Sequence, residues 1–245
     1  GSNLLNIAYQ MPSAHFVGID SASTHIERGR QLAAAAGISN YELHAMDIMD
    51  FGEELGRFDY ILCHGVFSWV PGPVRERILG ICKAHMTEKG IAYISYNALP
   101  GWRMYGMLRD MMRYHAFKME GTQDRIDQAR AVVQFVSECV IDPYTPYGNF
   151  LQNNVDFISR LTGEYLYHEY LEAENTPFYF HEFVELAAAK GLQYLGDTEF
   201  HTMTNLNYSE GTKDLLDAIG SVDAVIVRSD IIDPEATACW NFLDP

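Results

Sequence analysis

The chain has 245 residues, 48% of them hydrophobic, which is enough for one large domain or for two small ones, each with its own core. Its 17 basic and 33 acidic residues give a formal net charge of −16. A nucleic-acid backbone requires a basic face, so this balance argues against a nucleic-acid-binding protein and is compatible with a basic partner. Acidity that serves only solubility is the alternative.

The cysteines and the distribution of apolar residues indicate the compartment. Four cysteines show no C-x-x-C pair and no disulfide-like spacing, which is typical of a reducing environment: Cys63, Cys82, Cys139 and Cys239. No apolar run approaches the roughly 18 residues that span a bilayer, and no basic segment followed by an apolar one marks a secretory signal. We therefore expect a cytoplasmic protein without membrane insertion.

The first third of the chain alternates helical and extended patterns. Residues 3–11 are predicted as a helix and residues 15–20 as a strand that ends in Asp20. Ser23 or Thr24 can cap the next helix, which runs to Gly37. Residues 41–45 are predicted as a strand, followed by Asp47. Each of these two strands is therefore followed by a carboxylate.

The central stretch predicts one βαβ unit. Residues 58–62 are apolar and aromatic, as in a strand buried on both faces, and polar residues follow at Cys63-His64-Gly65. Residues 71–89 are predicted as a helix closed by Gly90, and 91–95 as the next strand. Ligands of open parallel sheets bind at the carboxyl ends of the strands. A candidate site is thus expected at residues 63–68 and at Tyr96-Asn97.

The second half of the sequence is mainly helical. Helical periodicity or composition covers four segments: 104–118, 124–140, 155–172 and 183–190. Residues 142–148 form a turn-rich break. Gly191 closes the last helix, and 192–195 is predicted as a strand that returns to the sheet. The apolar segments 215–219 and 222–227 are assigned to no element.

The order of elements predicts an α/β fold, a doubly wound sheet with its first strand and glycine loop lying before the sequence, plus a mainly helical accessory region. Gly1-Ser2 is either the tail of that loop or a remnant of a cloning tag. We expect the core to span 1–103 and the helical region 104–245. Residues 178–197 are expected to return a helix and a strand to the core sheet.

Two carboxylates carry the binding hypothesis. Asp20 ends a strand about 20 residues after the expected glycine loop, where doubly wound folds hold ribose hydroxyls; the alternative is a helix-capping role beside Ser21 and Ser23. Asp47 can accept a hydrogen bond from an adenine amine, or it is an ordinary loop acid. Both readings of each residue remain open from the pattern alone.

Hydrolytic and metal chemistry have little support in the sequence. Ser68 lacks a G-x-S-x-G context, and neither His168-Glu169 nor His181-Glu182 continues into H-E-x-x-H, so no metal site is predicted. Aromatic residues near the strand ends are core residues by default, although their faces would also suit a sulfonium or ammonium cation: Phe67, Trp69, Tyr96 and Trp102.

Several stretches resemble one family: residues 15–20, Met46-Asp47, 58–71, 95–97 and 100–102, together with 107–115, 167–171 and 177–195. They are similar to class I S-adenosylmethionine-dependent methyltransferases, and more narrowly to bacterial ones with a methyltransferase regulatory domain, a group that includes protein-lysine methyltransferases. The resemblance covers roughly residues 1–200.

The resemblance implies S-adenosylmethionine as the cofactor and assigns residues to it. Asp20 would bind the ribose, Asp47 and Ile48 the adenine, and His64 to Val66 would lie by the methionine moiety and the methyl group. The full set of implied cofactor residues is Gly1, Asp20, Ser21, Asp47, Ile48, His64, Gly65 and Val66. Tyr96, Asn97 and His64 are candidates for orienting the acceptor.

The resemblance further implies methyl transfer to a protein amine, lysine in the first instance, with a basic acceptor and a homodimer as an option. A small-molecule methyltransferase with a closed pocket under the 104–172 helices is the alternative among enzymes. A methyltransferase-like binding or regulatory module with little cofactor affinity is the alternative from another class. An NAD-type oxidoreductase would share the Asp20 argument, but the 97–102 stretch argues against it.

Overall fold

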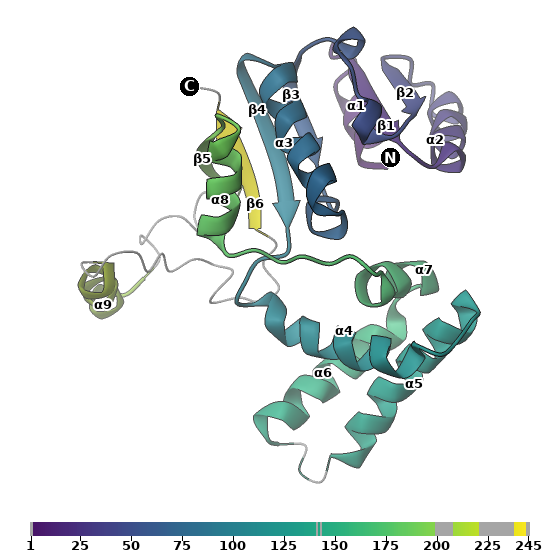
Figure 1. The fold of residues 1–245 in the computed structure, drawn as a ribbon, viewed down its shortest axis with the longest axis vertical. Helices are drawn as coiled ribbons and strands as arrows, with labels where there is room; N and C mark the ends of the chain where they lie inside the picture. The colour runs from purple at the N-terminus through teal and green to yellow at the C-terminus, as the bar shows by residue number, and fades with distance from the viewer. Residues whose placement is uncertain (1, 141, 143, 199–207, 221–237, 244–245) are drawn as a thin grey trace.

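The structure, a computed structural model, describes residues 2–140, 142, 144–198, 208–220 and 238–243. It has two lobes (Figure 1). One lobe contains the strands and the helices α1, α2, α3 and α8; the other contains α4 to α7. The α9 helix (Glu210–Gly220) lies apart from both lobes.

The strands form two sheets. A two-stranded parallel sheet pairs β1 (Phe16–Asp20) with β2 (Tyr41–Ala45). A four-stranded sheet has the order β3-β4-β6-β5, with bounds Phe58–Cys63, Met86–Tyr96, Ala238–Leu243 and Gln193–Asp197. β3 and β4 are parallel, and β6 is antiparallel to both of its neighbours. The mixed α/β fold and the five expected strands are confirmed, whereas β6 was not predicted.

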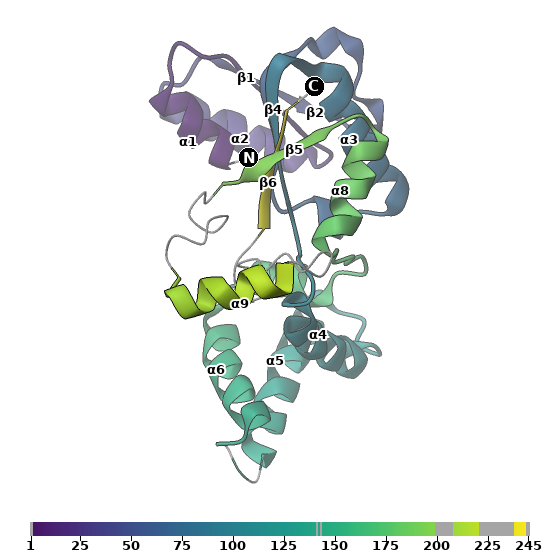
Figure 2. The same cartoon turned by 90° about the vertical axis from the view of Figure 1, so that its left-hand side faces the viewer.

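Helices cover opposite sides of the strands (Figure 2). α1 (Ser2–Gln10) and α2 (Ser23–Ala35) lie on one side, and α3 (Gly72–His85) and α8 (Phe180–Ala189) on the other. The main core lies between α3, α8 and β4, where alternate β4 residues, Ala92, Ile94 and Tyr96, are buried. The period of two places these side chains on one face of the strand. Residues 178–197 thus return a helix and a strand to the sheet, as predicted.

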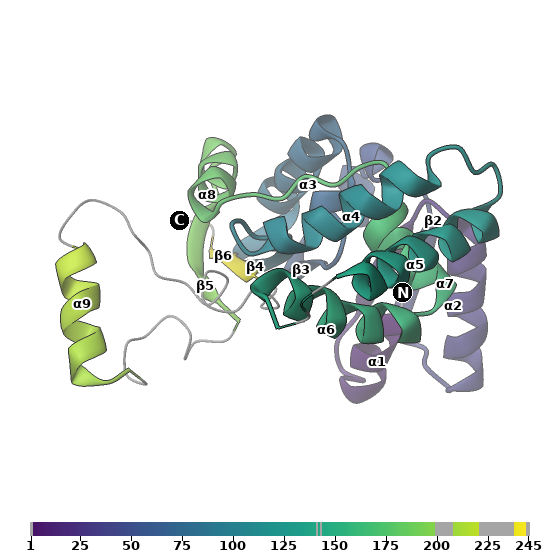
Figure 3. The same cartoon turned by 90° about the horizontal axis from the view of Figure 1, so that it is seen from below.

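The helical lobe has a core of its own. Its helices are α4 (Trp102–Ala116), α5 (Thr122–Cys139), α6 (Pro146–Arg160) and α7 (Gly163–Leu166), followed by a π-helical turn, Tyr167–Leu171. Apolar residues four apart, such as Leu108, Met112 and Ala116 of α4, line one face and are buried. Seen from below, α4, α5 and α6 overlie the strand lobe (Figure 3).

Two segments that connect the lobes run side by side. Ala98 and Phe178 form a parallel bridge, in which the Phe178 N–H donates to the Asn97 oxygen at 2.9 Å and the Leu99 N–H to the Phe178 oxygen at 2.8 Å. Trp102 Nε1 donates to Asn175 Oδ1 at 3.0 Å. The helical lobe is therefore joined to the carboxyl end of β4 by a hydrogen-bonded double connection.

The prediction that the strand at 58–62 is buried on both faces is wrong. Tyr60 and Leu62 of β3 are 66% and 59% exposed, while Ile61 and Cys63 pack on the main core. In the described part of the chain β3 is an edge strand: β1 and β2 pair only with each other, and α3 covers a single face. An apolar run by itself does not specify which face is covered.

The helix predicted over 71–89 ends earlier, and Gly90 is not its cap. α3 ends at His85, and β4 already begins at Met86, whose side chain is buried in the main core. Gly90 lies inside β4 beside a register shift against β3. Its position is crowded: an added Cβ would lie 2.9 Å from Met86 Cβ, 3.0 Å from the Thr87 nitrogen and 3.1 Å from the Phe58 oxygen. Close backbone approach, not helix termination, explains this glycine.

We therefore expect Gly90→Ala to lower the free energy of unfolding by about 1–3 kcal/mol, because two of the crowding atoms belong to backbone that must shift. Gly80→Ala is the matched control, since a Cβ at this position in α3 meets nothing within 4 Å and alanine favours a helix. Urea denaturation measures the free energy of unfolding of both variants and of the unchanged protein. Equal stability of the two variants would contradict the crowding argument.

Two further helix boundaries differ from the sequence prediction. The α2 N-cap is Ala22, not Ser23 or Thr24: its backbone oxygen accepts the His25 N–H at 3.0 Å, and its own N–H donates to Asp20 Oδ1 at 2.8 Å. The predicted helix 155–172 is divided. α6 starts at Pro146 and ends at Arg160, and the Thr162 side chain caps the new start by accepting the Tyr165 N–H at 3.3 Å.

Candidate functional site

The carboxyl ends of β1 and β2 bring two acids to the same edge. The strands pair in register with Asp20 opposite Ala45, and the Met46 N–H donates to the Asp20 backbone oxygen at 3.0 Å. Asp20 is half-buried, with Oδ1 on the Ala22 N–H and Oδ2 at 3.2 Å from His25 Nδ1. Asp20 thus holds the backbone just before α2, although the N-cap residue of α2 is Ala22 and has no side-chain cap. A carboxylate accepts about four hydrogen bonds, so it retains capacity for a ligand.

Asp47 also has one oxygen committed to its own loop. Its Oδ1 accepts the Met49 N–H at 2.9 Å and caps a 3₁₀ turn, Ile48–Asp50. The carboxylate is exposed, and the neighbouring Ile48 packs partly against the main core. Ser21 is exposed, and Gly1 lies outside the described residues. The structure thus places an acid and an apolar side chain together at the end of β2.

The end of β3 is arranged by residues of β4. Gly65 has a φ of 68°, a left-handed conformation that suits glycine, and its N–H donates to Ser95 Oγ at 2.8 Å. His64 is exposed, and its Nδ1 lies 2.9 Å from the Tyr93 hydroxyl, with the two rings stacked. Val66 is exposed as well. The turn 64–66 is therefore exposed at this edge, with the His64 imidazole, the Gly65 backbone and the Val66 side chain accessible to a ligand.

Behind this turn Cys82 is buried in the main core and Cys63 packs partly buried against it; burial raises the pKa of the Cys63 thiol to about 12 and that of Cys82 further above its usual range. The thiolate is the reactive form. We expect iodoacetamide at pH 8 to modify the exposed Cys139 in the folded protein and to leave Cys63 and Cys82 unmodified until urea is added. Peptide mass spectrometry reads out each site. Equal rates at Cys63 and Cys139 would contradict burial of the thiol.

The two candidates at the end of β4 have different surroundings. Tyr96 is 2% exposed and stacks on Phe183, with ring centroids 4.3 Å apart, so its ring belongs to the main core. Asn97 is half-buried; its backbone N–H donates to Ser68 Oγ at 2.8 Å. Its side-chain Nδ2 is buried and has no hydrogen-bond partner within the described residues. Of the two, Asn97 has the donor that a ligand at this edge would satisfy.

A second group lies where the helical lobe meets this edge; the sequence indicated its two tryptophans, Trp69 and Trp102, but not Arg109 or His168. The Trp69 ring contacts Trp102 edge-on at 6.1 Å and His168 at 4.7 Å, and Arg109 lies over it at 5.7 Å. Arg109 is only 4% exposed, and its Nη2 donates to the Glu172 oxygen. An arginine inside a polar helical pattern gives no signal of such burial, which arises only from packing.

Burial shifts the charges of this group. Desolvation lowers the pKa of Arg109 to about 10, with nearby Arg113 contributing. Desolvation also raises the pKa of Glu169 to about 7, although the Arg109 charge acts in the opposite direction. Both shifts follow from removal of charged groups from water. Among the described residues, no group of three or more His, Cys, Asp or Glu side chains is placed to hold a metal ion.

Comparison with known proteins decides the family. A family model described as a methyltransferase domain matches residues 1–156. The chain belongs to this methyltransferase family. A second family model, described as a predicted methyltransferase regulatory domain, matches residues 162–233. The first match covers the edge formed by β1 to β4 and most of the helical lobe.

The chain is also similar to proteins of solved structure and to relatives of known sequence. The structure of PKMT2 from Rickettsia typhi covers 100% of this chain, with 36% sequence identity and a TM-score of 0.81. The structure of PKMT2 in complex with AdoHcy covers 98% of this chain, with 36% sequence identity and a TM-score of 0.80. Two uncharacterized proteins of Rickettsia prowazekii (strain Madrid E) are similar as well. RP789 is 41% identical over 91% of this chain, and RP028 is 40% identical over 80% of it.

The chain spans 46% of the length of PKMT2, 40% of RP789 and 78% of RP028. The match to PKMT2 covers both lobes, so the methyltransferase fold of the strand lobe and the helical lobe occur together in that protein as well. No helix within the described residues has both the length and the apolar character needed to cross a bilayer.

Proposed function

We propose that this chain catalyses transfer of the methyl group of S-adenosylmethionine to a protein amine, that of a lysine side chain. The similarity to PKMT2 over the entire chain carries the proposal: that name denotes a protein lysine methyltransferase, and the protein was solved with AdoHcy. The net charge of −16 supports a basic acceptor. A protein acceptor is favoured over a free metabolite on these grounds.

The residues present fit the adenosine part of the cofactor. Asp20 and Asp47 lie on neighbouring parallel strands, and each keeps lone pairs beyond its hydrogen bonds to the chain. Carboxylates at these positions suit ribose hydroxyls and an adenine amine. Asn97 adds a buried amide donor without a partner in the described part of the chain. The proposed cofactor residues are Asp20, Ser21, Asp47, Ile48, His64, Gly65 and Val66, with Gly1 outside the described range.

The bound cofactor supplies a methyl group that is activated by its positively charged sulfur. The protein's tasks are to align the acceptor nitrogen with that methyl group and to exclude water. The acceptor must arrive as a neutral amine, although a lysine has a reference pKa of about 10.4. A site that removes the ammonium from water and takes up its proton lowers this obstacle.

The two cores support a functional division of the chain. We propose that residues 1–103 bind the cofactor and that residues 104–245 shape the acceptor site, with 178–197 completing the sheet of the first part. The buried clusters around β4 and around α4 to α7 support this boundary, because each contains side chains from its own part. The Trp69, Trp102 and Asn175 contacts between the lobes support an acceptor site at their junction.

The test combines binding and transfer. Calorimetric titration of the chain with S-adenosylhomocysteine is expected to show micromolar binding. Incubation with tritiated S-adenosylmethionine is expected to label poly-L-lysine, and free lysine far less. Labelling of free amines at the same efficiency would favour the small-molecule alternative. Absence of both binding and labelling would overturn the proposed function and favour a binding or regulatory module.

A further inference from the structure

A groove lies between α8 and the segment that precedes it. The chain crosses from the helical lobe to α8 in this segment (Figure 1), and residues 176–178 form one wall of the groove. The groove has a volume of about 420 Å³. Its other wall is formed by residues of α8: Glu182, Glu185, Leu186 and Ala189.

The α8 residues of the groove share one face of the helix, because positions three, four and seven apart lie above one another. All of them are exposed. Phe183 and Ala187, on the face that packs on the sheet, are buried in the main core instead. Leu186 and Ala189 therefore form an exposed apolar strip, and the carboxylates of Glu182 and Glu185 lie beside it.

Both carboxylates can accept further hydrogen bonds. Glu182 Oε2 accepts the Tyr179 N–H at 2.8 Å, and its other oxygen remains. Glu185 has no hydrogen bond or ion pair within the described residues. A carboxylate offers about four sites to donors, so each of these acids can bind a cation.

The cations of the neighbouring segments are held by other partners. Arg75 of α3 donates to Thr176 Oγ1 at 3.2 Å, and its guanidinium lies over the Phe178 ring at 5.5 Å. Lys190, just after α8, pairs with Glu76 of α3 at 3.5 Å. Among the described residues that line the groove there is no lysine or arginine. Charge complementarity therefore selects a cationic occupant.

The groove adjoins the edge that carries the candidate cofactor site. The Phe178 N–H donates to the Asn97 oxygen at 2.9 Å, at the end of β4, and the Thr176 N–H donates to the Ser68 oxygen at 2.7 Å, in the turn after β3. The wall 176–178 is thus bonded directly to the ends of two parallel strands. A segment bound in the groove would lie one chain's width from this edge.

We propose that the groove binds a lysine-bearing segment of the acceptor protein, next in sequence to the lysine that receives the methyl group. The aliphatic stems of the bound lysines lie on Leu186 and Ala189, and their ammonium groups reach Glu182 and Glu185. An anionic segment would be repelled by both acids. This inference rests on the proposed methyl transfer and adds how the acceptor protein is recognised.

The test reverses one charge in the groove and one far from it. Glu185→Lys is expected to raise the KM for poly-L-lysine by about five- to tenfold and to leave kcat and the affinity for S-adenosylhomocysteine unchanged. Glu138→Lys, at an exposed position of α5, changes the net charge by the same amount. It is expected to change this KM by less than about twofold, because only charges close to the bound segment contribute strongly.

A second measurement does not depend on methyl transfer. Fluorescence anisotropy of labelled poly-L-lysine reports its binding to the protein, and Glu185→Lys is expected to weaken this binding by the same factor as it raises the KM. Circular dichroism melting checks that the variants fold. Should Glu185→Lys fail to fold, Glu185→Gln removes the charge with little change of shape and is expected to weaken binding by about threefold.

Several results would overturn the inference while the proposed methyl transfer stands. One is an unchanged KM and an unchanged anisotropy titration in Glu185→Lys. Another is an equal loss in Glu138→Lys, which would reveal general charge attraction only. Sedimentation of a dimer that Glu185→Lys dissociates would assign the groove to a second copy of the chain. If the unchanged protein neither binds S-adenosylhomocysteine nor labels poly-L-lysine, the proposed function fails, and the anisotropy titration alone decides whether the groove binds lysine-bearing segments.

Discussion

Asp20→Ala is expected to weaken binding of S-adenosylhomocysteine by about 100-fold. The variant removes acceptors for two ribose hydroxyls, and hydrogen bonds to a charged group contribute about 1.5 kcal/mol each. The expectation follows from the position of Asp20 at the end of β1, with lone pairs left after its bonds to Ala22 and His25. Calorimetric titration of the variant and of the unchanged protein measures the difference.

Asp20 also accepts the N–H of Ala22, the N-cap residue of α2, so a control must separate folding from binding. Asp20→Asn keeps the oxygen that accepts the Ala22 N–H and loses the charge. Its melting temperature is expected to equal that of the unchanged protein. Its affinity for S-adenosylhomocysteine is still expected to be about tenfold lower, which corresponds to about 1.4 kcal/mol. Asp50→Ala, a change at an exposed acid nearby, is expected to bind normally. Full affinity in Asp20→Ala would show that Asp20 serves only to hold the chain before α2.

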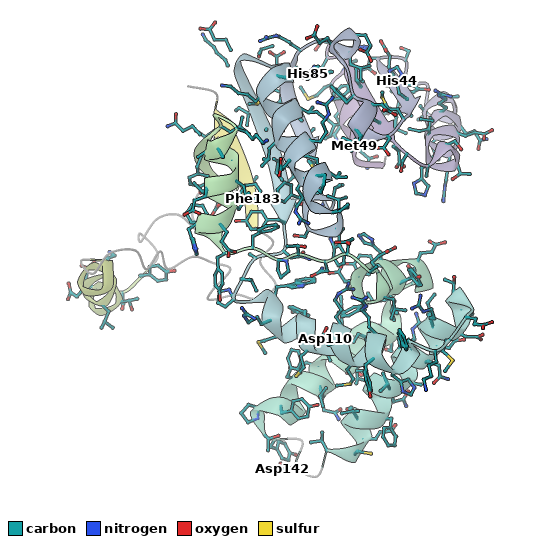
Figure 4. The ribbon with its side chains drawn as sticks, in the orientation of Figure 1. His44, Met49, His85, Asp110, Asp142 and Phe183 are labelled. Carbon is teal, nitrogen blue, oxygen red and sulfur yellow. The ribbon has the colours of Figure 1, made fainter. Side chains whose placement is uncertain are left out.

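Phe183→Ala is expected to lower the free energy of unfolding by about 3–5 kcal/mol, since truncation of a fully buried phenylalanine leaves a cavity. Phe183, labelled in Figure 4, lies on the face of α8 that meets the sheet and is 0% exposed. Its ring stacks on Tyr96 at 4.3 Å and meets Phe67 edge-on at 5.1 Å. It therefore joins α8 to the end of β4 and to the turn after β3.

Urea denaturation of Phe183→Ala and of Leu186→Ala provides the comparison. Leu186 lies on the same helix and is 38% exposed, so its truncation is expected to cost about 1 kcal/mol. Because Phe183 supports Tyr96, the variant is also expected to bind S-adenosylhomocysteine more weakly at temperatures where it remains folded. A loss of stability no larger than that of Leu186→Ala would show that α8 does not stabilise the sheet.

Much of the candidate cofactor edge could be predicted because strand ends are local features. The strand at 41–45 is observed with the predicted bounds, and Asp20 ends β1 as expected. The sequence predicts one continuous helix over residues 155–172, because apolar residues such as Val155, Ile158 and Leu166 continue a helical pattern past residue 160. Pro146 at the start of α6 and the Thr162 cap decide its real boundaries.

Long-range contacts account for the errors. Gly90 has the sequence context of a helix cap, but its neighbours Met86 and Phe58 place it in a crowded strand. Nothing in residues 238–243 predicted a strand, yet β6 finds partners in both β4 and β5. For Tyr96, a core residue by default and a candidate for orienting the acceptor, the structure shows the ring packed on Phe183 in the main core.

The sequence by itself determined the alternation of helices and strands, the polar residues that follow each parallel strand, and the resemblance to methyltransferases. These depend on residue order and short spacings. Only the tertiary structure decided that Arg109 is buried over Trp69 and that Glu169 has a raised pKa. Both properties depend on removal of charged groups from water by residues about 40 to 60 positions away, which no local pattern records.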